Sequence, residues 1–199
     1  LFSESLVAVD LKTGQRRWHF QLVHHGVWDM DIPCAPILAD VMIDGRLRKI
    51  VAQPTKQAFL YVFDRITGEP IWPIEERPVP KGDVPGEWYA PTQPIPPKPD
   101  LREGFSLDDV IDFPPEPRPE GLKLIERYRI GPIFTPPSLS RAEGPIATLT
   151  MAAQGAATNW PGGSFDPETG ILYVASQSQP RPLGLVPAPP GTSDLPYHQ

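Results

Sequence analysis

Cysteine, clustered basic residues and long apolar runs are all scarce in this 199-residue chain. The one cysteine, Cys34, excludes an internal disulfide and a cysteine-based zinc site within this segment. No stretch approaches the roughly 18 apolar residues in a row that a membrane-spanning helix needs. The formal net charge is −6, and basic residues cluster only at 16–17 and 46–49. Nucleic acid is therefore not expected as a partner, because its phosphates require a concentrated basic surface.

Proline, in contrast, is abundant, with 29 residues. A non-periodic excess of proline is typical of disorder, but here aromatic residues and isoleucine are interleaved with the prolines throughout. This mixture favours long, stiff loops on a rigid scaffold. The chain begins at Leu1 rather than at methionine, and it ends in a proline-rich run. We therefore expect an interior fragment of a longer protein, with any secretion signal or membrane anchor outside it.

A turn motif occurs twice, because segments 10–18 and 64–72 carry Asp, Thr, Gly and Trp at identical spacing. In such a turn the Asp side chain bonds nearby backbone, and Gly supplies a positive φ angle. Each copy follows an apolar run, at 6–9 and at 59–63, so each predicts a strand, a tight turn and a return strand. The tryptophan then packs between neighbouring units. Segment 166–170 has the same turn chemistry without the tryptophan and predicts a simple hairpin.

Short strands follow one another between the two copies. They are expected at 37–43, 47–53, 59–63 and around 71–72, with a tight turn at Asp44 and Gly45. Residues 36–75 should therefore form one four-stranded antiparallel sheet, with Trp18 and Trp72 in equivalent places. One such sheet per 40–50 residues or so is typical of a β-propeller blade, which needs a neighbour on each face. The sequence thus predicts an all-β fold in which residues 1–199 are part of a single β-propeller domain.

Residues 73–131 interrupt this pattern and are predicted to form a proline-rich excursion on one face of the propeller. Its expected parts are a loop at 78–99, a short helix opened by a capping box at 106–109 and reaching 111, and a second helix at 119–128. Strand character returns after Ile133, at 147–153 and 170–176.

The densest group of reactive side chains lies at 24–31, in a connection between blades that is expected to face the central channel. On an extended backbone Asp29 and Asp31 point to the same side. Two such carboxylates need a cation or donors nearby, so they suit a hard metal such as Ca²⁺, and one of them suits a general base. The alternative is that they cap backbone N–H groups. Adjacent His24 and His25 face opposite ways on a strand, so structural roles are expected for them rather than a shared metal.

Two further positions carry suitable chemistry. Lys56 lies between two apolar strands at the mouth of the same blade; it is either a solvated loop lysine or a member of the Asp29 site. Asn159 and Trp160 offer an amide and a flat ring ahead of a strand; the alternative there is an ordinary turn with a buried tryptophan.

Taken together, these segments resemble the dehydrogenases that depend on pyrroloquinoline quinone (PQQ), especially the membrane-type glucose and alcohol dehydrogenase branch. The resemblance rests on segments 23–25 and 28–33, on Lys56 twenty-seven residues after Asp29, and on segments 64–69, 91–94, 133–137 and 166–170. It extends nearly from end to end of the chain.

The resemblance implies an eight-bladed propeller with PQQ near its axis. Asp29 matches the family's catalytic base, and Lys56 matches the cation that contacts the quinone's reactive carbonyl. Asp31 matches a position that adds a metal ligand in some relatives, so Asp29 and Asp31 are the expected ligands of Ca²⁺ or Mg²⁺. Asn159 and Trp160 match positions that approach the cofactor. The family's ring-stacking tryptophan and most of its metal ligands precede the first residue.

The resemblance also implies a reaction and a location. An aldose sugar or an alcohol is oxidised by hydride transfer to the quinone, and a membrane quinone or a cytochrome accepts the electrons. The protein is then expected in the periplasm, with any membrane anchor outside this chain. The sequence departs from the family at Gly26, where many relatives have an acidic or polar residue, and this alters the rim of the pocket rather than the base.

Two competing interpretations come from other classes. A non-catalytic scaffold propeller needs the turn motifs but not Asp29, Asp31 and Lys56 together, and the joint presence of these three favours the enzyme. A glycosidase that uses Asp29 and Asp31 is the third, and no other feature of the chain calls for it.

Overall fold

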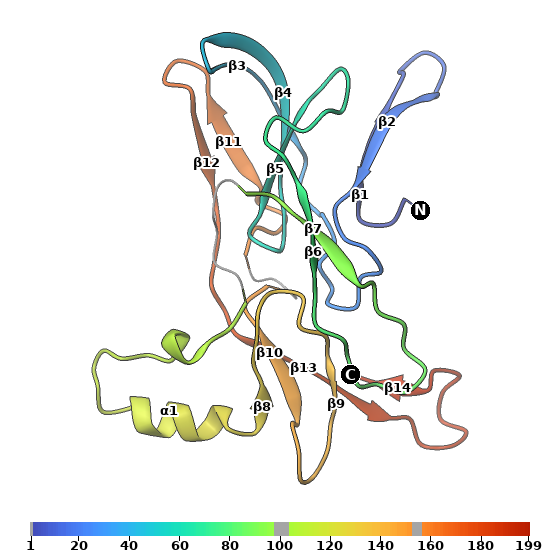
Figure 1. Cartoon of the computed structure of the whole chain (residues 1–199), viewed down its shortest axis with the longest axis vertical. Helices are drawn as coiled ribbons and strands as arrows, with labels where there is room; N and C mark the ends of the chain where they lie inside the picture. The colour runs from blue at the N-terminus through green and yellow to red at the C-terminus, as the bar shows by residue number, and fades with distance from the viewer. Residues whose placement is uncertain (1, 98–103, 153–156) are drawn as a thin grey trace.

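The computed structural model describes residues 2–97, 104–152 and 157–199, and strands predominate in it (Figure 1). The strands are β1 (Ser5–Val9), β2 (Arg16–Gln21), β3 (Ile37–Ile43), β4 (Arg46–Pro54), β5 (Leu60–Asp64), β6 (Glu75–Pro78), β7 (Thr92–Ile95), β8 (Tyr128–Arg129), β9 (Ser138–Leu139), β10 (Ala147–Thr150), β11 (Gly163–Asp166), β12 (Ile171–Val174), β13 (Arg181–Pro187) and β14 (Tyr197–His198). The helices are the 3₁₀ turn η1 (Leu107–Asp109) and α1 (Arg118–Ile125). Neither helix in these ranges has the length and apolar character of a bilayer span.

Strands β1 and β2 form the hairpin predicted from the first turn motif. They pair antiparallel, and the N–H of Gly14 donates to the carbonyl of Asp10 at 2.8 Å. Asp10 Oδ1 accepts hydrogen bonds from the backbone N–H groups of Lys12 and Thr13. Gly14 has a φ of 69°, which is the conformation the motif requires of its glycine.

Strands β3, β4 and β5 form an antiparallel sheet in that order, but the predicted fourth strand does not form. The return of the chain is limited to a bridge between Phe63 and Pro70 and to one hydrogen bond from Ile71 N–H to Val62 O at 2.8 Å. Pro70 has no N–H to donate, and Pro73 follows closely, so the ladder cannot continue. The prediction of four strands within 36–75 was wrong in this respect.

Both faces of this sheet are covered, one by hairpin β1–β2 and the other by hairpin β11–β12, which lie on opposite sides of it in Figure 1. Side chains alternate along β4 and β5, so that Val51 and Phe63 face the first hairpin while Ile50 and Val62 face the second. A sheet with a neighbour on each face is the arrangement expected of packed blades.

The two repeat tryptophans face corresponding neighbours. Trp18 packs on β5 and on the second turn, where its Nε1 donates to the carbonyl of Arg65 at 3.2 Å. Trp72 packs against the same core residues of β4 and β5 as Phe165 and Leu172, which belong to the hairpin that contains the third turn. The equivalence is incomplete, because Trp18 lies within β2 whereas Trp72 lies beyond the last bridge of its unit.

The segment 73–131 contains a hairpin that the sequence did not predict. Strands β6 and β7 pair antiparallel, with Glu76 opposite Pro94, and β7 lies inside the stretch 78–99 that was expected to be a proline-rich loop. Proline is tolerated there because the hairpin has only two strands, and the carbonyl of Pro94 accepts a hydrogen bond from the Tyr61 hydroxyl at 2.7 Å. Residues 98 and 99 of the predicted loop lie outside the described residues.

The predicted helices and later strands are present but shorter. Ser106 and Asp109 form the expected capping box around η1, and α1 carries proline in its first turn. Strand β10 covers the start of the predicted strand 147–153, whose last residue lies outside the described part. Strands β11 and β12 enclose the predicted Asp166 turn. A second sheet, with the order β14-β13-β10-β8 and β9 beside β13, lies at the other end of the molecule from β3 and β4 (Figure 1).

Candidate functional site

The side chains of Asp29, Asp31 and Lys56 lie together. Lys56 Nζ donates to the backbone carbonyl of Asp29 at 3.2 Å and to its Oδ2 at 3.4 Å. The same ammonium donates to Asp31 Oδ1. The lysine side chain is 7% exposed, whereas the carboxylate side chains are 54% and 52% exposed. Of the two interpretations of Lys56, contact with Asp29 is the one that the structure has, and the solvated loop lysine is wrong.

The turn between β4 and β5 positions Lys56. The N–H of Thr55 donates to the carbonyl of Phe59, and the N–H of Ala58 donates to the carbonyl of Thr55, each at 3.0 Å. Ala58 adopts a φ of 63°, a conformation that is uncommon for a residue with a Cβ. Since these bonds close the turn, Lys56 is directed inward at the end of a buried strand rather than into solvent.

Asp29 and Asp31 reach Lys56 by a route that the sequence did not indicate. The sequence placed the two carboxylates on one side only on the condition of an extended backbone, and that condition is not met, because Asp29 has a φ of 61°, in the left-handed region, and no strand covers residues 22–36. Both carboxylates nevertheless face the same ammonium. Left-handed non-glycine residues are strained and persist only where the surroundings fix them.

Trp28 anchors the start of this segment in the core. Its ring is 3% exposed, and its Nε1 donates to the carbonyl of Thr135 at 2.9 Å. The ring also meets Phe134 edge-on, with centroids 5.3 Å apart. Residue 28 is thus fixed to a part of the chain more than a hundred positions away, which holds Asp29 in place from its N-terminal side.

The cluster is electrically unbalanced, because two carboxylates share one ammonium. Their half-exposed oxygens leave room for a cation, and carboxylate oxygens are the ligands that Ca²⁺ and Mg²⁺ prefer. Ca²⁺ takes about 6–8 oxygen ligands. Within the described ranges, no three residues among His, Cys, Asp and Glu are grouped to hold a metal. Asp29 and Asp31 therefore supply at most a part of such a site.

The adjacent histidines contact different parts of the β6–β7 hairpin. His24 Nε2 lies 2.9 Å from the carboxylate of Glu76 in β6. His25 Nε2 lies 3.2 Å from the carboxylate of Glu87, and the His25 ring meets Trp88 edge-on at 4.4 Å. The rings contact different partners, as expected for adjacent residues, and these contacts tie residues 24–25 to the hairpin.

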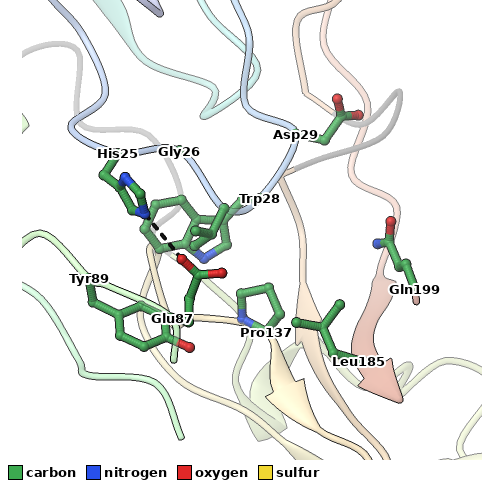
Figure 2. Close-up of a pocket in the computed structure, with 11 residues that line it drawn as sticks. His25, Gly26, Trp28, Asp29, Glu87, Tyr89, Pro137, Leu185 and Gln199 are labelled. Atoms are coloured by element: carbon green, nitrogen blue, oxygen red, sulfur yellow. Dashed lines mark hydrogen bonds and ion pairs between the residues drawn. The ribbon is translucent and has the colours of Figure 1, made fainter. Parts of the chain in front are cut away.

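A cavity of about 340 Å³ lies beside residues 25–29 (Figure 2). Its walls come from this segment, from the β6–β7 connection, and from residues 137, 184, 185 and 199. In Figure 2 the carboxylate of Asp29 points away from the group formed by Trp28, Glu87 and Pro137. Asp29 thus belongs both to the wall of the cavity and to the carboxylate–lysine cluster.

Asn159 and Trp160 lie in a turn that no hydrogen bond connects to Lys56 or to Asp29 among the described residues. Asn159 Oδ1 accepts from the backbone N–H of Trp160 at 2.9 Å, and its carbonyl accepts from Gly162 N–H at 3.0 Å. The Trp160 ring is 77% exposed, so the alternative of a buried tryptophan is wrong. The roles of both residues toward a cofactor stay predictions.

Two residues near the cluster were missed by the sequence interpretation. Gln57 is fully buried, and its Nε2 donates to the carbonyl of Met30 at 3.2 Å. Glu4 lies over Gly26, whose N–H it accepts, and a Cβ at Gly26 would overlap its carboxylate. Burial raises the pKa of Glu4 above its ordinary value, and the nearby charge of Asp31 adds to the rise. The only sequence signals were the position of Gln57 next to Lys56 and the glycine at 26.

Comparison with known proteins identifies the architecture. A family model described as "Glucose/ethanol/alcohol dehydrogenase, beta-propeller domain", of the PQQ type, matches residues 1–197. Among solved structures, a quinohemoprotein alcohol dehydrogenase from Pseudomonas putida HK5 superimposes with a TM-score of 0.55 over 98% of this chain, at 23% identity, and shows the same fold. The predicted fold class, a partial all-β propeller, is confirmed. The placement of residues 1–199 in one domain stays a prediction.

Curated relatives support the same assignment. Quinoprotein glucose dehydrogenases from Escherichia coli (strain K12) and Gluconobacter oxydans (strain 621H) are 31% and 35% identical to this chain, each over 96% of its length. A glycerol dehydrogenase large subunit from Gluconobacter thailandicus is 36% identical over 86% of the chain. The chain spans 23% of the length of each of these relatives. With nearly its whole length matched, the chain belongs to the family of PQQ β-propeller domains of glucose, ethanol and alcohol dehydrogenases.

Proposed function

We propose that the protein containing this chain is a PQQ-dependent dehydrogenase that oxidises a sugar or an alcohol, and that Asp29, Asp31 and Lys56 belong to its active site. The observation that carries the proposal is the buried ammonium of Lys56 held between two half-exposed carboxylates. A scaffold propeller has no need of a desolvated lysine with two acidic partners, because such a charge is costly to bury.

The residues fit the cofactor and metal that the family implies. A buried ammonium suits an anionic, carbonyl-bearing ligand, and the carboxylates offer hard oxygen donors to a divalent cation. Lys56 would hold the quinone, and Asp29 with Asp31 would hold part of the coordination of Ca²⁺ or Mg²⁺. When bound, PQQ supplies a two-electron acceptor that the side chains of the protein lack.

Asp29 would act as the proton acceptor. Its Oδ2 interacts with Lys56 at 3.4 Å, while Oδ1 has no hydrogen-bond partner in the described part of the chain. An alcohol hydroxyl that donates to Oδ1 would give its proton to Asp29, while the carbon that bears the hydroxyl would lose a hydride to the two-electron acceptor. Lys56 offsets the negative charge of the pair of carboxylates and is placed to stabilise negative charge that develops on a ligand oxygen. Asn159 and Trp160 would contact the cofactor from the β11 side.

The names of the relatives support the proposed substrate class. Glucose and glycerol occur in the names of the proteins to which this chain is similar, and both present a primary or secondary hydroxyl group. A membrane quinone or a cytochrome would then accept the electrons, and the reaction would take place in the periplasm.

Reconstitution tests the proposal directly. The complete protein is loaded with PQQ and either Ca²⁺ or Mg²⁺, and dye-linked oxidation of aldoses and alcohols is measured, with NAD as a negative control. Asp29→Asn keeps the shape but removes the proton acceptor, so turnover should fall by about 10²–10⁴-fold while the quinone still binds. Asp40→Asn is the matched control, because Asp40 is an exposed carboxylate paired with Arg65 at 2.9 Å.

Two outcomes would overturn the proposal. Near-normal turnover in Asp29→Asn at saturating PQQ and metal would contradict the role of Asp29 as the base. Absence of quinone binding by the wild-type protein would support the scaffold interpretation instead.

A further inference from the structure

We propose that Gln57 is a positioning residue that fixes the peptide plane between Met30 and Asp31, so that both carboxylates face Lys56. The expected effect of Gln57 on turnover rests on the proposed function. Its effect on the positions of Asp31 and Lys56 does not depend on the cofactor. Gln57 is 0% exposed and lies in the same turn as Lys56.

Two side chains of the β4–β5 turn donate hydrogen bonds to two successive backbone carbonyl groups. Lys56 Nζ donates to the carbonyl of Asp29, and Gln57 Nε2 donates to the carbonyl of Met30, each at 3.2 Å. Because a peptide group is planar, fixing these two oxygens fixes the planes Asp29–Met30 and Met30–Asp31. These are the two planes that separate the carboxylates, so their relative orientation is set by consecutive side chains of one turn.

The buried amide of Gln57 lowers the stability of the fold. Its Oε1 is buried and has no hydrogen-bond partner in the described residues. An apolar side chain of similar volume would avoid this penalty, since a buried unpaired acceptor destabilises a fold. The opposite amide orientation would bring Oε1 against the carbonyl oxygen of Met30, so the donor must face Met30. The contribution of the amide is therefore the bond to Met30.

The bond matters because the backbone it holds is strained. Asp29 has a φ of 61°, and such conformations persist only where the surroundings over-determine them. Trp28 fixes the segment before Asp29, and Gln57 fixes it after Met30. Without Gln57, the Met30–Asp31 plane is free to rotate and Asp31 can leave Lys56. The ammonium then loses one of its two carboxylates.

The test uses Gln57→Met in the complete protein, because Met keeps the length and loses the amide. Gln93→Met is the matched control: Gln93 is also 0% exposed, and its amide also bonds the backbone of this connection, accepting from His24 N–H at 2.8 Å and donating to His24 O at 2.6 Å. Both variants lose a buried amide, but only the first releases the plane next to Asp31.

The first readout is the reactivity of Lys56 in the protein without cofactor. Reductive methylation followed by mass spectrometry measures its labelling rate relative to exposed Lys81. In Gln57→Met, Lys56 should label several-fold faster than in the wild type, and in Gln93→Met its rate should stay at the wild-type value. Gln57→Asn, whose amide is one methylene too short to reach Met30, should behave like Gln57→Met and replaces it if that variant fails to fold.

The second readout is the split between kcat and KM in the protein loaded with PQQ and metal. Misplacing a reacting group by about 1 Å costs up to roughly 10²-fold in rate, so kcat should fall by about 10- to 100-fold in Gln57→Met while KM changes little. Unchanged labelling of Lys56 together with unchanged kcat would overturn the inference. If the wild type shows no PQQ-dependent turnover, the proposed function fails, and the labelling rates alone decide the role of Gln57.

Discussion

The indole ring of Trp18 lies directly against Gly68, a residue of the neighbouring unit's turn. A Cβ placed on Gly68 would be 2.6 Å from both Cδ2 and Cγ of that ring, and Gly68 has a φ of 79°. The glycine of the turn motif therefore has two functions at this position. It supplies the left-handed backbone conformation, and it leaves room for the tryptophan of the preceding copy.

Gly68→Ala should consequently destabilise the protein more than Gly14→Ala. Gly14 occupies the same place in the first turn, with a φ of 69°, and no atom lies within 4 Å of the position that a Cβ would take there. Its replacement should cost about 1 kcal/mol for backbone strain alone. The Gly68 variant should lose an additional 1–3 kcal/mol, roughly, from overpacking. Thermal unfolding of both variants measures the difference. Equal losses of stability would show that the Trp18 ring moves away from the added methyl group without destabilising the fold.

Lys56→Met should weaken both cofactor retention and turnover. The variant leaves Asp29 and Asp31 without their shared ammonium, so the two carboxylates repel each other. Quinone absorbance after desalting reports the retention of PQQ, and dye reduction reports turnover. Lys81→Met, on the surface, is the control and should retain both properties. Full retention of PQQ in Lys56→Met would remove Lys56 from the cofactor site.

Trp28→Phe should lower the free energy of unfolding by about 1–3 kcal/mol. The variant keeps an aromatic ring in the core but leaves the carbonyl of Thr135 without the Nε1 donor that now lies 2.9 Å away. Chemical denaturation measures the change. Trp88→Phe, whose ring is 58% exposed, should have little effect. If the two substitutions prove equally mild, the hydrogen bond to Thr135 contributes little to stability.

Glu4→Gln should change the pH dependence of stability. Burial raises the pKa of Glu4, so the folded protein binds this proton more tightly than the unfolded chain does. The stabilising contribution of protonated Glu4 is therefore complete below its pKa in the unfolded chain, about 4.3. It is lost as the pH rises through the higher pKa of Glu4 in the folded protein. The variant should gain stability relative to the wild type over that interval. Thermal midpoints of the metal-free protein between about pH 4 and 7 measure this; a constant difference would contradict it.

The sequence predicted the elements whose causes are local. The Asp–Gly turns at 10–14, 64–68 and 166–170 form because side-chain and backbone bonds within five residues determine them. The limits of β3 were predicted correctly for the same reason, since Asp44 and Gly45 both have positive φ angles. Hairpin β6–β7 was missed because its stability comes from distant partners, such as the bond from Tyr61 to Pro94.

The site was predicted in part for a comparable reason. Lys56 and Asp29 were recognised by residue type and spacing, and their contact is confirmed. The left-handed backbone of Asp29 was not predictable, because Lys56, Trp28 and Gln57 impose it through bonds between segments far apart in the sequence. Glu4 was missed for a related reason: its link to Gly26 joins the residues before β1 to the segment after β2, and no periodic pattern along the chain relates the two.

The alternation along β4 and β5 has a consequence for how the blades are ordered. The face toward hairpin β1–β2 carries the rings of Tyr61 and Phe63, whereas the face toward β11–β12 carries the smaller Ala52 and Val62. A slip of one residue in the register would exchange these two sets and direct aromatic rings to the wrong neighbour. The two faces of the sheet thus present different side chains to the hairpin that precedes it and to the hairpin that follows it, so the pairing register of β4 and β5 also decides which neighbour each face fits.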